Sequence, residues 1–405
     1  MDKTSKTSKS TQLGRREFLA GAAAAATFTI LRPSLVRGTE ANSKIALGLI
    51  GCGGRGGMIA GLFAKHGGYQ LASCGDYFAD RAKGVGNKHK LDDAHCHSGL
   101  SNYKKVLADN VDAVAIISPP YFHPGQAAAA VEAGKHVYVA KPIAVDVPGC
   151  ASIEESGKKA AAKKLVFLVD FQTRANAFYQ EAVKRVQNGD IGRLVNGTAG
   201  YFCGLIFGTE LPADAEGRLR HWGMDKVLSG DIITEQNIHS IDVCSWIADA
   251  QPLTAVGTGG RKLRTGDNVI FDHFNLVFEY PDGLAVSFAS RQFGAGPGGI
   301  DNVMYGTKGA IETHYGGDVK IHGKAPYPGG NTGKIYVDGP TANIATFCES
   351  IKAGKAENPT LAPSVRSNLT TILGRMAAYT GRKITWDEMI KANEKLDPHL
   401  DGAKD

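Results

Sequence analysis

The sequence predicts an α/β protein with two domains: an N-terminal doubly wound parallel sheet and a C-terminal α+β domain built on an open, largely antiparallel sheet. Three observations lead to this fold class. Apolar strands alternate with helix-like segments from Lys44 to about residue 170. Longer strand-like segments that lie closer together in the sequence follow. The length of 405 residues also exceeds what one hydrophobic core usually accommodates.

The first half reads as a parallel sheet covered by helices on both faces. Val111–Ile117 is a continuous apolar run, as expected of a strand that is buried on both sides. Pro124 suits the first turn of a helix that extends to Glu132, and Gly134 suits its end. The other elements expected here are the strands Ile45–Ile50, Tyr69–Cys74, His136–Val139 and Leu165–Val169 and a helix over Met58–Lys65.

The second half reads as a sheet of mainly antiparallel strands. The turn Pro281-Asp282-Gly283 joins two strand-like segments in the manner of a hairpin. The expected strands are Leu194–Phe202, Ala255–Gly259, Phe271–Tyr280, Leu284–Arg291 and Asp318–His322. Helices over Ala175–Gln187, Ile238–Ala248, Ala342–Ala353 and Val365–Thr380 are expected to cover one face of this sheet.

The first 38 residues resemble a bacterial twin-arginine export signal. The pair Arg15-Arg16 is followed by Phe18-Leu19, and an alanine-rich run of about 12 residues, too short to span a bilayer, follows. We expect cleavage near Gly38, passage through the twin-arginine machinery, and a periplasmic or exported location. A disordered basic tail and an uncleaved membrane anchor are the alternatives. The expected domains are then 39–170, for cofactor binding, and 171–405, for substrate binding.

Composition is that of a soluble globular protein, with 43% hydrophobic and 21% charged residues. The net charge is +6, but residues 1–38 hold seven basic and two acidic residues, so the remaining chain is close to neutral. No basic stripe follows residue 38, and we expect no nucleic-acid partner. The seven cysteines are scattered and odd in number, which does not suggest a disulfide framework.

The glycine loop Gly51-Cys52-Gly53-Gly54-Arg55-Gly56 lies between an expected strand and an expected helix. Gly51 permits the tight turn, Gly53 and its neighbour Gly54 let the backbone approach a pyrophosphate, and Gly56 allows close helix–strand packing. Asp76 ends the next strand and is positioned for the adenosine ribose hydroxyls, which favours NAD over NADP. We also assign Arg55 to the cofactor. Its positive charge and that of Arg81 would weaken the preference for NAD over NADP.

Two further strands end in segments that should reach the nicotinamide, because ligands bind beyond the carboxyl ends of such sheets. One is Ser118-Pro119-Pro120-Tyr121-Phe122-His123 and the other is Ala140-Lys141-Pro142. We therefore assign Ser118, Tyr121, His123 and Lys141 to the cofactor.

These motifs resemble those of the glucose–fructose oxidoreductase / inositol dehydrogenase family, from about residue 44 to about 390. In that family a strand ends in Glu-Lys-Pro, with the lysine near the nicotinamide; here Ala140 replaces the glutamate. The family also has an acidic residue four positions before a histidine, which Glu235 and His239 match. The resemblance implies that His239 takes the hydroxyl proton while Lys141 polarises the oxygen. A dry site beside a cation also permits Lys141 as the base.

On a continuous helix Glu235, His239 and Asp242 would share one face, so that the carboxylate one turn away orients the imidazole. Catalytic roles therefore go to Lys141, Glu235 and His239. The substrate-contacting residues are expected to be Arg174, Trp222, Asn237 and Asp242, with Asp242 alternatively a structural partner.

One sequence cluster invites a metal interpretation. His89, His95, Cys96 and His97 lie close together, but in a loop-like stretch without a ligand pair at helical spacing. We expect no metal.

The function expected is NAD(H)-dependent oxidation of a hydroxyl on a sugar, sugar derivative or cyclitol. Because free NAD is scarce outside the cytoplasm, an exported enzyme is expected to hold its cofactor tightly and to recycle it. Two alternatives stay open: a redox-neutral NAD-dependent glycosidase that works by oxidation, elimination, hydration and reduction, and a non-catalytic sugar or nucleotide sensor. The resemblance also implies a homodimer or homotetramer formed through the C-terminal sheet.

Overall fold

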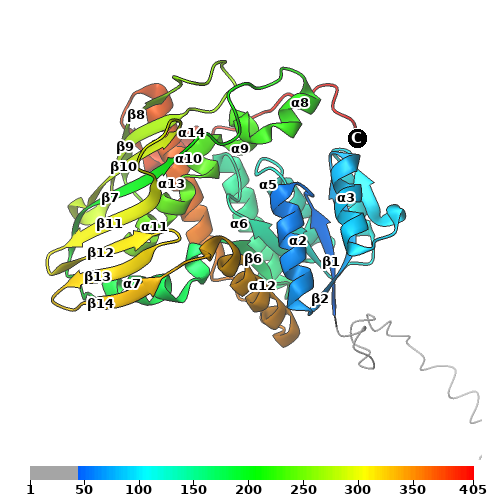
Figure 1. Cartoon of the computed structure of the whole chain (residues 1–405), viewed down its shortest axis with the longest axis horizontal. Coiled ribbons are helices and arrows are strands. Elements are labelled where there is room, and N and C mark those ends of the chain that lie inside the picture. The colour runs from blue at the N-terminus through cyan, green and yellow to red at the C-terminus, as the bar shows by residue number, and fades with distance from the viewer. Residues whose placement is uncertain (1–43) are drawn as a thin grey trace, which may run out of the picture. The chain divides into compact units, whose positions relative to one another are not determined.

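The computed structural model describes residues 44–405, and the predicted fold class is confirmed (Figure 1). The first domain is a six-stranded sheet in the order β3-β2-β1-β4-β5-β6, with every neighbouring pair parallel. Its strands are β1 (Ile45–Ile50), β2 (Tyr69–Asp76), β3 (Cys96–Ser98), β4 (Ala113–Ile116), β5 (His136–Ala140) and β6 (Phe167–Asp170). Its helices are α2 (Gly54–His66), α3 (Ala79–His89), α4 (Asn102–Ala108), α5 (His123–Glu132) and α6 (Val147–Ala162).

The strand order reverses between β1 and β4, and this reversal positions the site. The carboxyl ends of the two strands diverge there, leaving the crevice in which open α/β sheets bind ligands. Strands β4 and β5 are buried almost throughout, which explains their uninterrupted apolar sequence. The glycine loop follows β1 and therefore opens into this crevice.

The second domain is built on a nine-stranded sheet, in the order β14-β13-β12-β11-β7-β10-β9-β8-β15. All pairs are antiparallel except β7 with β10. The strands are β7 (Leu194–Cys203), β8 (Thr254–Gly260), β9 (His273–Glu279), β10 (Ala285–Gln292), β11 (Gly299–Gly306), β12 (Gly309–His314), β13 (Asp318–Gly323), β14 (Tyr327–Asn331) and β15 (Ile384–Thr385). Strands β11, β12 and β14 escaped the sequence analysis because glycines and charged residues interrupt their apolar alternation.

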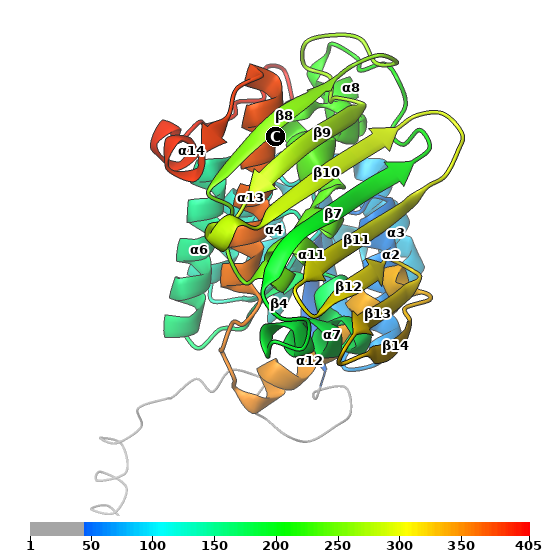
Figure 2. The same cartoon turned by 90° about the vertical axis from the view of Figure 1, so that its left-hand side faces the viewer.

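Three helices lie behind this sheet, namely α7 (Ala177–Gln187), α11 (Ile238–Ala248) and α13 (Leu361–Thr380), while the strands form its front (Figure 2). The shorter elements of the domain are α8 (Ala215–Arg220), α9 (Lys226–Ser229), α10 (Asp231–Glu235) and α14 (Trp386–Ala392). The 3-10 turns are η3 (Asp93–His95), η4 (Thr173–Ala175), η5 (Trp222–Met224) and η6 (Pro281–Gly283).

The fourth helix expected to cover the second sheet does not do so. Helix α12 (Ile335–Ala353) packs against α2 of the first domain instead. Its buried side chains Ile344, Phe347 and Cys348 form an apolar stripe that packs into the core of the first domain. Tyr69 Oη adds a hydrogen bond to the carbonyl of Ile344 (2.9 Å). The stripe was visible in the sequence, but its partner surface was not.

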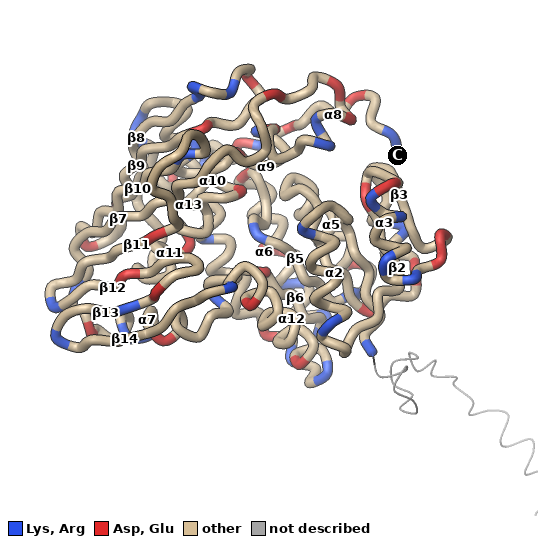
Figure 3. Tube along the Cα trace, viewed as in Figure 1, with Lys and Arg blue, Asp and Glu red and all other residues tan. Residues whose placement is uncertain are grey.

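Acidic and basic residues are interspersed along the trace in Figure 3. Between residues 44 and 405, no helix combines the length and the apolar character that crossing a membrane requires. The predicted export signal lies outside the described residues.

Candidate active site

The glycine loop forms a cradle whose open side faces the crevice. Gly51 has φ +95°, and a side chain there would place its Cβ 2.5 Å from the amide of Ser118. A Cβ at Gly56 would lie 1.9 Å from the carbonyl oxygen of Gly51, so this position must stay bare for α2 to approach β1. A Cβ at Gly54, by contrast, would meet nothing within 4 Å, and one at Gly53 would meet only Arg81 Nη1, at 3.9 Å. The bare backbone there leaves space for a pyrophosphate, whose contact with these glycines stays a prediction.

Asp76 sits at the end of β2 and supports the loop. One carboxylate oxygen accepts a hydrogen bond from the amide of Cys52 (2.7 Å), and the other accepts one from the amide of Phe78 (3.0 Å). Each oxygen retains a second lone pair, and Asp76 lines the cavity, so ribose hydroxyls have an acceptor here. Burial raises the pKa of Asp76, although these two amides favour the charged form.

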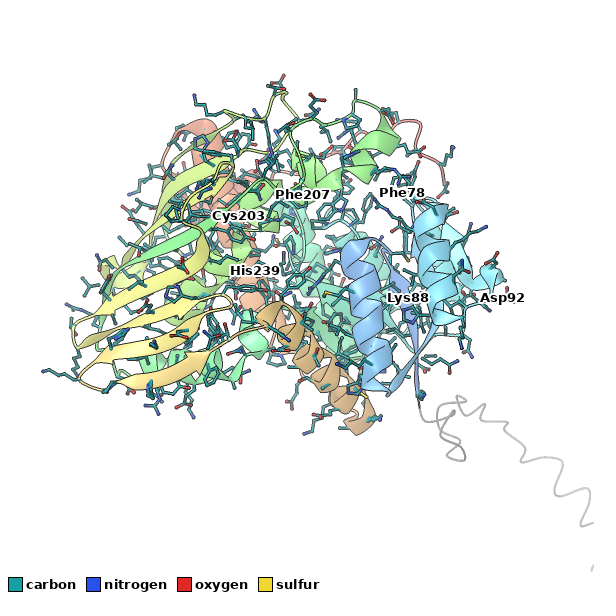
Figure 4. The ribbon with its side chains drawn as sticks, in the orientation of Figure 1. Phe78, Lys88, Asp92, Cys203, Phe207 and His239 are labelled. Atoms are coloured by element: carbon teal, nitrogen blue, oxygen red, sulfur yellow. The ribbon has the colours of Figure 1, made fainter. Side chains whose placement is uncertain are left out.

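The glycine loop opens into a cavity whose walls come from both domains. From the second domain, Leu219 and Trp222 close it; Figure 4 shows Phe78 of the first domain below α8. Trp222, which was expected in the sugar wall, lines this cavity together with the glycine loop, and its contact with substrate stays a prediction. Its 3-10 turn follows α8, whose Arg220 lies over the ring of Phe78 in the first domain (3.9 Å from the centroid). The remaining lining residues are Ile50, Gly51, Gly53, Asp76, Tyr77, Phe78, Arg81, Gly99, Leu100, Asn102, Ile117, Ser118, Pro119, Phe122 and Gln126.

Arg55 does not project freely into the cavity. Its guanidinium donates a hydrogen bond to Asp170 at the end of β6 (3.1 Å) and lies over the ring of Tyr336 (4.7 Å from the centroid). Asp170 is 1% exposed at its side chain and would otherwise be an unpaired buried charge. Arg55 therefore joins the glycine loop to the edge of the sheet, and Arg81 is the arginine that lines the ribose end.

Three further residues assigned to the cofactor follow β4. Ser118 lines the cavity, and its hydroxyl donates a hydrogen bond to Gln126 (2.5 Å). Tyr121 packs beside the cavity against Phe122. His123 is 1% exposed, and its ring nitrogens lie 2.7–2.8 Å from the carbonyls of Ser118 and Pro142. Burial lowers the pKa of His123 to about 4, although both carbonyl contacts favour the charged form. The position of His123 indicates support for the two loops rather than direct contact with the cofactor.

Lys141 follows β5, and the Lys141–Pro142 peptide bond is cis. The Lys141 ammonium donates a hydrogen bond to the main-chain carbonyl of Glu235 (2.6 Å) and lies 3.5 Å from the Glu235 carboxylate. Both side chains are largely buried. The structure thus joins two residues that are 94 positions apart and that sequence analysis had assigned to catalysis separately.

His239 was expected one turn after Glu235 on a single helix, and the structure corrects that geometry. Helix α10 ends at Glu235 and α11 begins at Ile238. Between them the amide of Asn237 donates to the carbonyl of Ile232, five residues earlier, which widens the turn and changes the helix direction. The Glu235 side chain consequently meets Lys141 instead of orienting the imidazole.

The His239 side chain is buried between the second sheet and α2 (Figure 4). Its Nδ1 has no hydrogen-bond partner among residues 44–405. Burial is the main cause that lowers the pKa of His239 well below 6.5, and the positive charges of Lys141 and Arg55 act in the same direction. The imidazole is therefore neutral at physiological pH and able to accept a proton. The ring of Tyr315 lies beside it, with 5.2 Å between the ring centroids.

Arg174 and Asp242, both assigned to the substrate, bind each other. The Arg174 guanidinium donates two hydrogen bonds to the Asp242 carboxylate (2.8 and 3.0 Å) and stacks on Trp246 (4.8 Å). Asp242 is fully buried and also accepts a hydrogen bond from Ser367 (2.6 Å). The Arg174 Nε and Nη2 groups and the Asp242 carboxylate are committed to this pair, so the structural alternative fits Asp242 and extends to these groups of Arg174.

Asn237 remains a good candidate for contact with substrate. Its side chain is fully buried, and neither amide atom has a partner among the described residues. Tyr315 Oη and the outer carboxylate oxygen of Glu235 are also buried and unpartnered. Buried polar atoms without partners cost stability, so the group points to a ligand or water that satisfies them. Tyr315, in the turn after β12, was missed because nothing in its local sequence distinguishes it from the other tyrosines.

The histidine-rich segment before and within β3 engages a carboxylate. His95 Nδ1 and His97 Nε2 both lie within hydrogen-bond distance of Asp109 (3.1 and 2.8 Å). Within residues 44–405, no three His, Cys, Asp or Glu side chains are placed to hold a metal ion.

The last ten residues cross from the second domain to the first. Arg218 donates a hydrogen bond to a main-chain carbonyl in this segment (2.6 Å), the amide of Leu100 donates to the carbonyl of Lys404 (3.0 Å), and the amide of Lys404 donates to Tyr77 Oη (3.1 Å). Figure 1 shows the segment running past α8 to α3. We call residues 396–405 the C-terminal strap; it lies over residues that line the ribose end of the cavity.

A parallel sheet in this order, a glycine cradle and an acidic residue at the end of β2 define a dinucleotide-binding protein, here with a second domain that closes the site. A family model described as "Oxidoreductase family, NAD-binding Rossmann fold" matches residues 45–171. A second, described as "GFO/IDH/MocA C-terminal domain", matches residues 179–312. Together they cover more than half of the chain. The protein belongs to the GFO/IDH/MocA oxidoreductase family, which confirms the resemblance and the NAD-binding domain.

Individual relatives are more distant. The chain is 26% identical over 277 residues to "Inositol 2-dehydrogenase 2" of Saccharopolyspora erythraea, covering 66% of this chain and 73% of the relative. It is 27% identical over 219 residues to "scyllo-inositol 2-dehydrogenase (NAD(+))" of Bacillus subtilis, covering 51% and 56%. Among solved structures, "Levoglucosan dehydrogenase, complex with NADH and levoglucosan" matches with a TM-score of 0.68 at 18% identity, covering 84% and 99%. This last likeness supports the fold.

Proposed function

We propose that the protein is an NAD(H)-dependent oxidoreductase that acts on a hydroxyl of a sugar, sugar derivative or cyclitol. The observation that carries the proposal is the convergence of Lys141, Glu235 and a neutral, buried His239 beside the NAD-binding domain. The relatives named as inositol dehydrogenases favour a cyclic polyol as the substrate class. The unpartnered amide of Asn237 supports a substrate rich in hydroxyl groups.

In the proposed reaction the residues of this chain divide the work between proton transfer and electrostatics. NAD, when bound, accepts the hydride from the carbon that carries the hydroxyl. His239 takes the hydroxyl proton, because burial keeps its imidazole neutral and Nδ1 is uncommitted. Lys141 stabilises the developing negative charge on the oxygen, since its ammonium is held in place by Glu235 and retains further N–H groups for the substrate.

In this arrangement the Glu235 carboxylate compensates for the replacement of the family's glutamate by Ala140. Ala140 is buried and brings no charge to the site, whereas the Glu235 carboxylate approaches Lys141 from the second domain. The carboxylate needed to pair the lysine is therefore supplied across the domain junction. This supports an active enzyme rather than a sensor.

We further propose that NAD is resident and that the protein is exported by the twin-arginine pathway to the periplasm or beyond. The Arg15-Arg16 motif supports export. The C-terminal strap supports retention, because it bridges α8 and the first domain over the ribose end of the cavity. Deleting residues 396–405 should accelerate nucleotide release, measured by fluorescence after dilution. Release at the unchanged rate would contradict this role of the strap.

The bare face of the nine-stranded sheet is proposed as the contact between copies of the chain, in a dimer or tetramer. A groove on the sheet is lined in part by Val256, Val277 and Val303, with Thr198 and Ser287 beside them. Apolar strand residues at a groove that no helix of residues 44–405 covers (Figure 2) suit a second sheet. Light scattering of the full chain tests this, and a monomer at micromolar concentration would contradict it.

The function is tested by purifying the protein without added nucleotide and denaturing it to identify what is released. The native protein is then mixed with a panel of sugars and cyclitols while the absorbance of NADH is followed. We expect NAD(H) in the supernatant and reduction by at least one polyol. Absence of bound nucleotide, together with no reduction after NAD is added, would refute the oxidoreductase.

A further inference from the structure

Three of the seven cysteines come together beneath the ribose end of the cofactor cavity. Cys52 lies in the glycine loop, Cys74 on β2 and Cys96 on β3. Cys74 and Cys96 are direct partners in the parallel pairing of the two strands, and their sulfurs are 3.8 Å apart. The cysteines that look scattered in the sequence therefore include one close pair, formed by residues 22 positions apart.

The backbone geometry of this pair suits a disulfide. Neighbouring strands lie about 4.8 Å apart, inside the range of about 4.4–6.8 Å between Cα atoms that disulfides span. The sulfurs must approach to about 2.05 Å, which rotation of the side chains achieves without separating the strands. The missing side chain of Gly86 on α3 leaves space for the Cys96 sulfur in its present position, because a Cβ there would lie only 2.2 Å from that sulfur.

The two thiols differ in access and in electrostatics. Cys96 is partly exposed, whereas Cys74 is fully buried. Hydrogen bonding from Cys52 is the main cause that lowers the pKa of Cys74, and Cys96 contributes. Burial raises the pKa of Cys96 to about 11. The exposed thiol therefore reacts slowly at neutral pH and faster as the pH rises, and the buried one is a competent second nucleophile.

We propose that Cys74 and Cys96 form an intramolecular disulfide by exchange with an external disulfide. The Cys96 thiolate attacks one sulfur of the external disulfide, forming a mixed disulfide and releasing one thiol. Cys74 then attacks the Cys96 sulfur, closes the new S–S bond and releases the second thiol. Two protein thiols are oxidised, one external disulfide is reduced to two thiols, and the two thiol protons leave with them.

Cys52 is not a member of the pair. Its thiol donates to the carbonyl of Gly75 (3.4 Å), and hydrogen bonding to Cys74 together with burial raises its pKa. It stays protonated behind the glycine loop.

The position of the bond links it to the cavity. Strand β2 leads directly to Asp76 and Phe78, and β3 leads directly to Gly99 and Leu100, all of which line the ribose end. A bond between the strands would fix these two walls relative to each other. Export by the proposed route would carry the pair from a reducing into an oxidising compartment.

The test is thiol counting on the full chain, purified under reducing conditions and then incubated with oxidised glutathione. We expect the titratable thiols to fall by two from seven, and a peptide linking Cys74 to Cys96 in a non-reducing digest analysed by mass spectrometry. Cys96→Ser should abolish the linked peptide. Cys203→Ser is the matched control, since Cys203 is also partly exposed but lies on β7, away from α3 (Figure 4).

Two outcomes would overturn the proposal: glutathione retained on Cys96 with Cys74 still reduced, or a linked peptide that contains Cys52. Because no substrate turnover is measured, these outcomes are independent of the proposed reaction. Dissociation of NAD from the oxidised and reduced forms is then compared by stopped flow. Slower dissociation from the oxidised form is expected, and equal rates would remove the link between the disulfide and the cavity.

Discussion

Replacing His239 by alanine should remove the proton acceptor while leaving the fold intact. A positioned general base contributes about 10²–10⁴-fold to turnover. At 1.36 kcal/mol per tenfold, this is about 3–5 kcal/mol of activation free energy. The upper part of this range is expected, because the imidazole is buried and its Nδ1 has no competing partner among the described residues.

The assay is single-turnover reduction of bound NAD by the most active polyol, followed by absorbance. His322→Ala is the matched control, because this histidine is exposed on β13 and pairs only with Glu312 among the described residues. The control should turn over normally. A His239→Ala protein with full activity would refute the assignment of the proton acceptor.

The same histidine fixes the expected pH dependence. Burial lowers its folded pKa below 6.5, so the neutral base persists as the pH falls through 6.5 and the acid limb of kcat/KM lies below that value. The unfolded chain, by contrast, takes up the proton near pH 6.5. Stability from this group is therefore complete above 6.5 and is lost as the pH falls toward the folded pKa. An acid limb at or above 6.5 would contradict the buried neutral state.

Three other substitutions probe separate parts of the account. Glu235→Gln removes the negative charge beside Lys141 but keeps an acceptor oxygen, so turnover should fall while NAD binding persists; unchanged kcat would exclude the carboxylate charge from the site. Arg174→Met leaves the buried Asp242 charge without its partner and should lower the free energy of unfolding, measured in urea, by about 3–5 kcal/mol. Exposed ion pairs contribute only about 0–1 kcal/mol, so a loss in that range would argue against a buried pair. Gly53→Val fills the open side of the cradle and should weaken NAD binding by about 1–3 kcal/mol, or roughly fivefold to 150-fold in Kd by calorimetry; an unchanged Kd would place the pyrophosphate elsewhere.

The sequence predicted those features of the fold and of the candidate site that depend on local backbone geometry. The tight turn at Gly51 and the helix–strand contact at Gly56 depend on missing side chains, which a sequence reveals directly. The same holds for Asp76 at the end of its strand and Lys141 after β5. The reversal of strand order that opens the crevice followed from the alternation of strands and helices.

Which distant residues pair could not be predicted from the sequence, because such pairing depends on the complete fold and not on local geometry. Arg174 and Asp242, 68 positions apart, each had a plausible substrate role until the fold joined them. Glu235 and His239 have helical spacing, but a wide turn at Asn237 separates them. No residue in that stretch indicates that the helix is interrupted there. The C-terminal strap and the Cys74–Cys96 contact likewise exist only because distant segments meet.

The most direct test of the central claim is the fate of the hydrogen on the oxidised carbon. A polyol substrate deuterated at its carbon-bound positions is mixed with the protein for a single turnover, and the bound nucleotide is released and analysed by mass spectrometry. Hydride transfer to NAD in this cavity predicts NADH that carries one substrate deuterium. Nucleotide that stays oxidised, or NADH without the label, would contradict it.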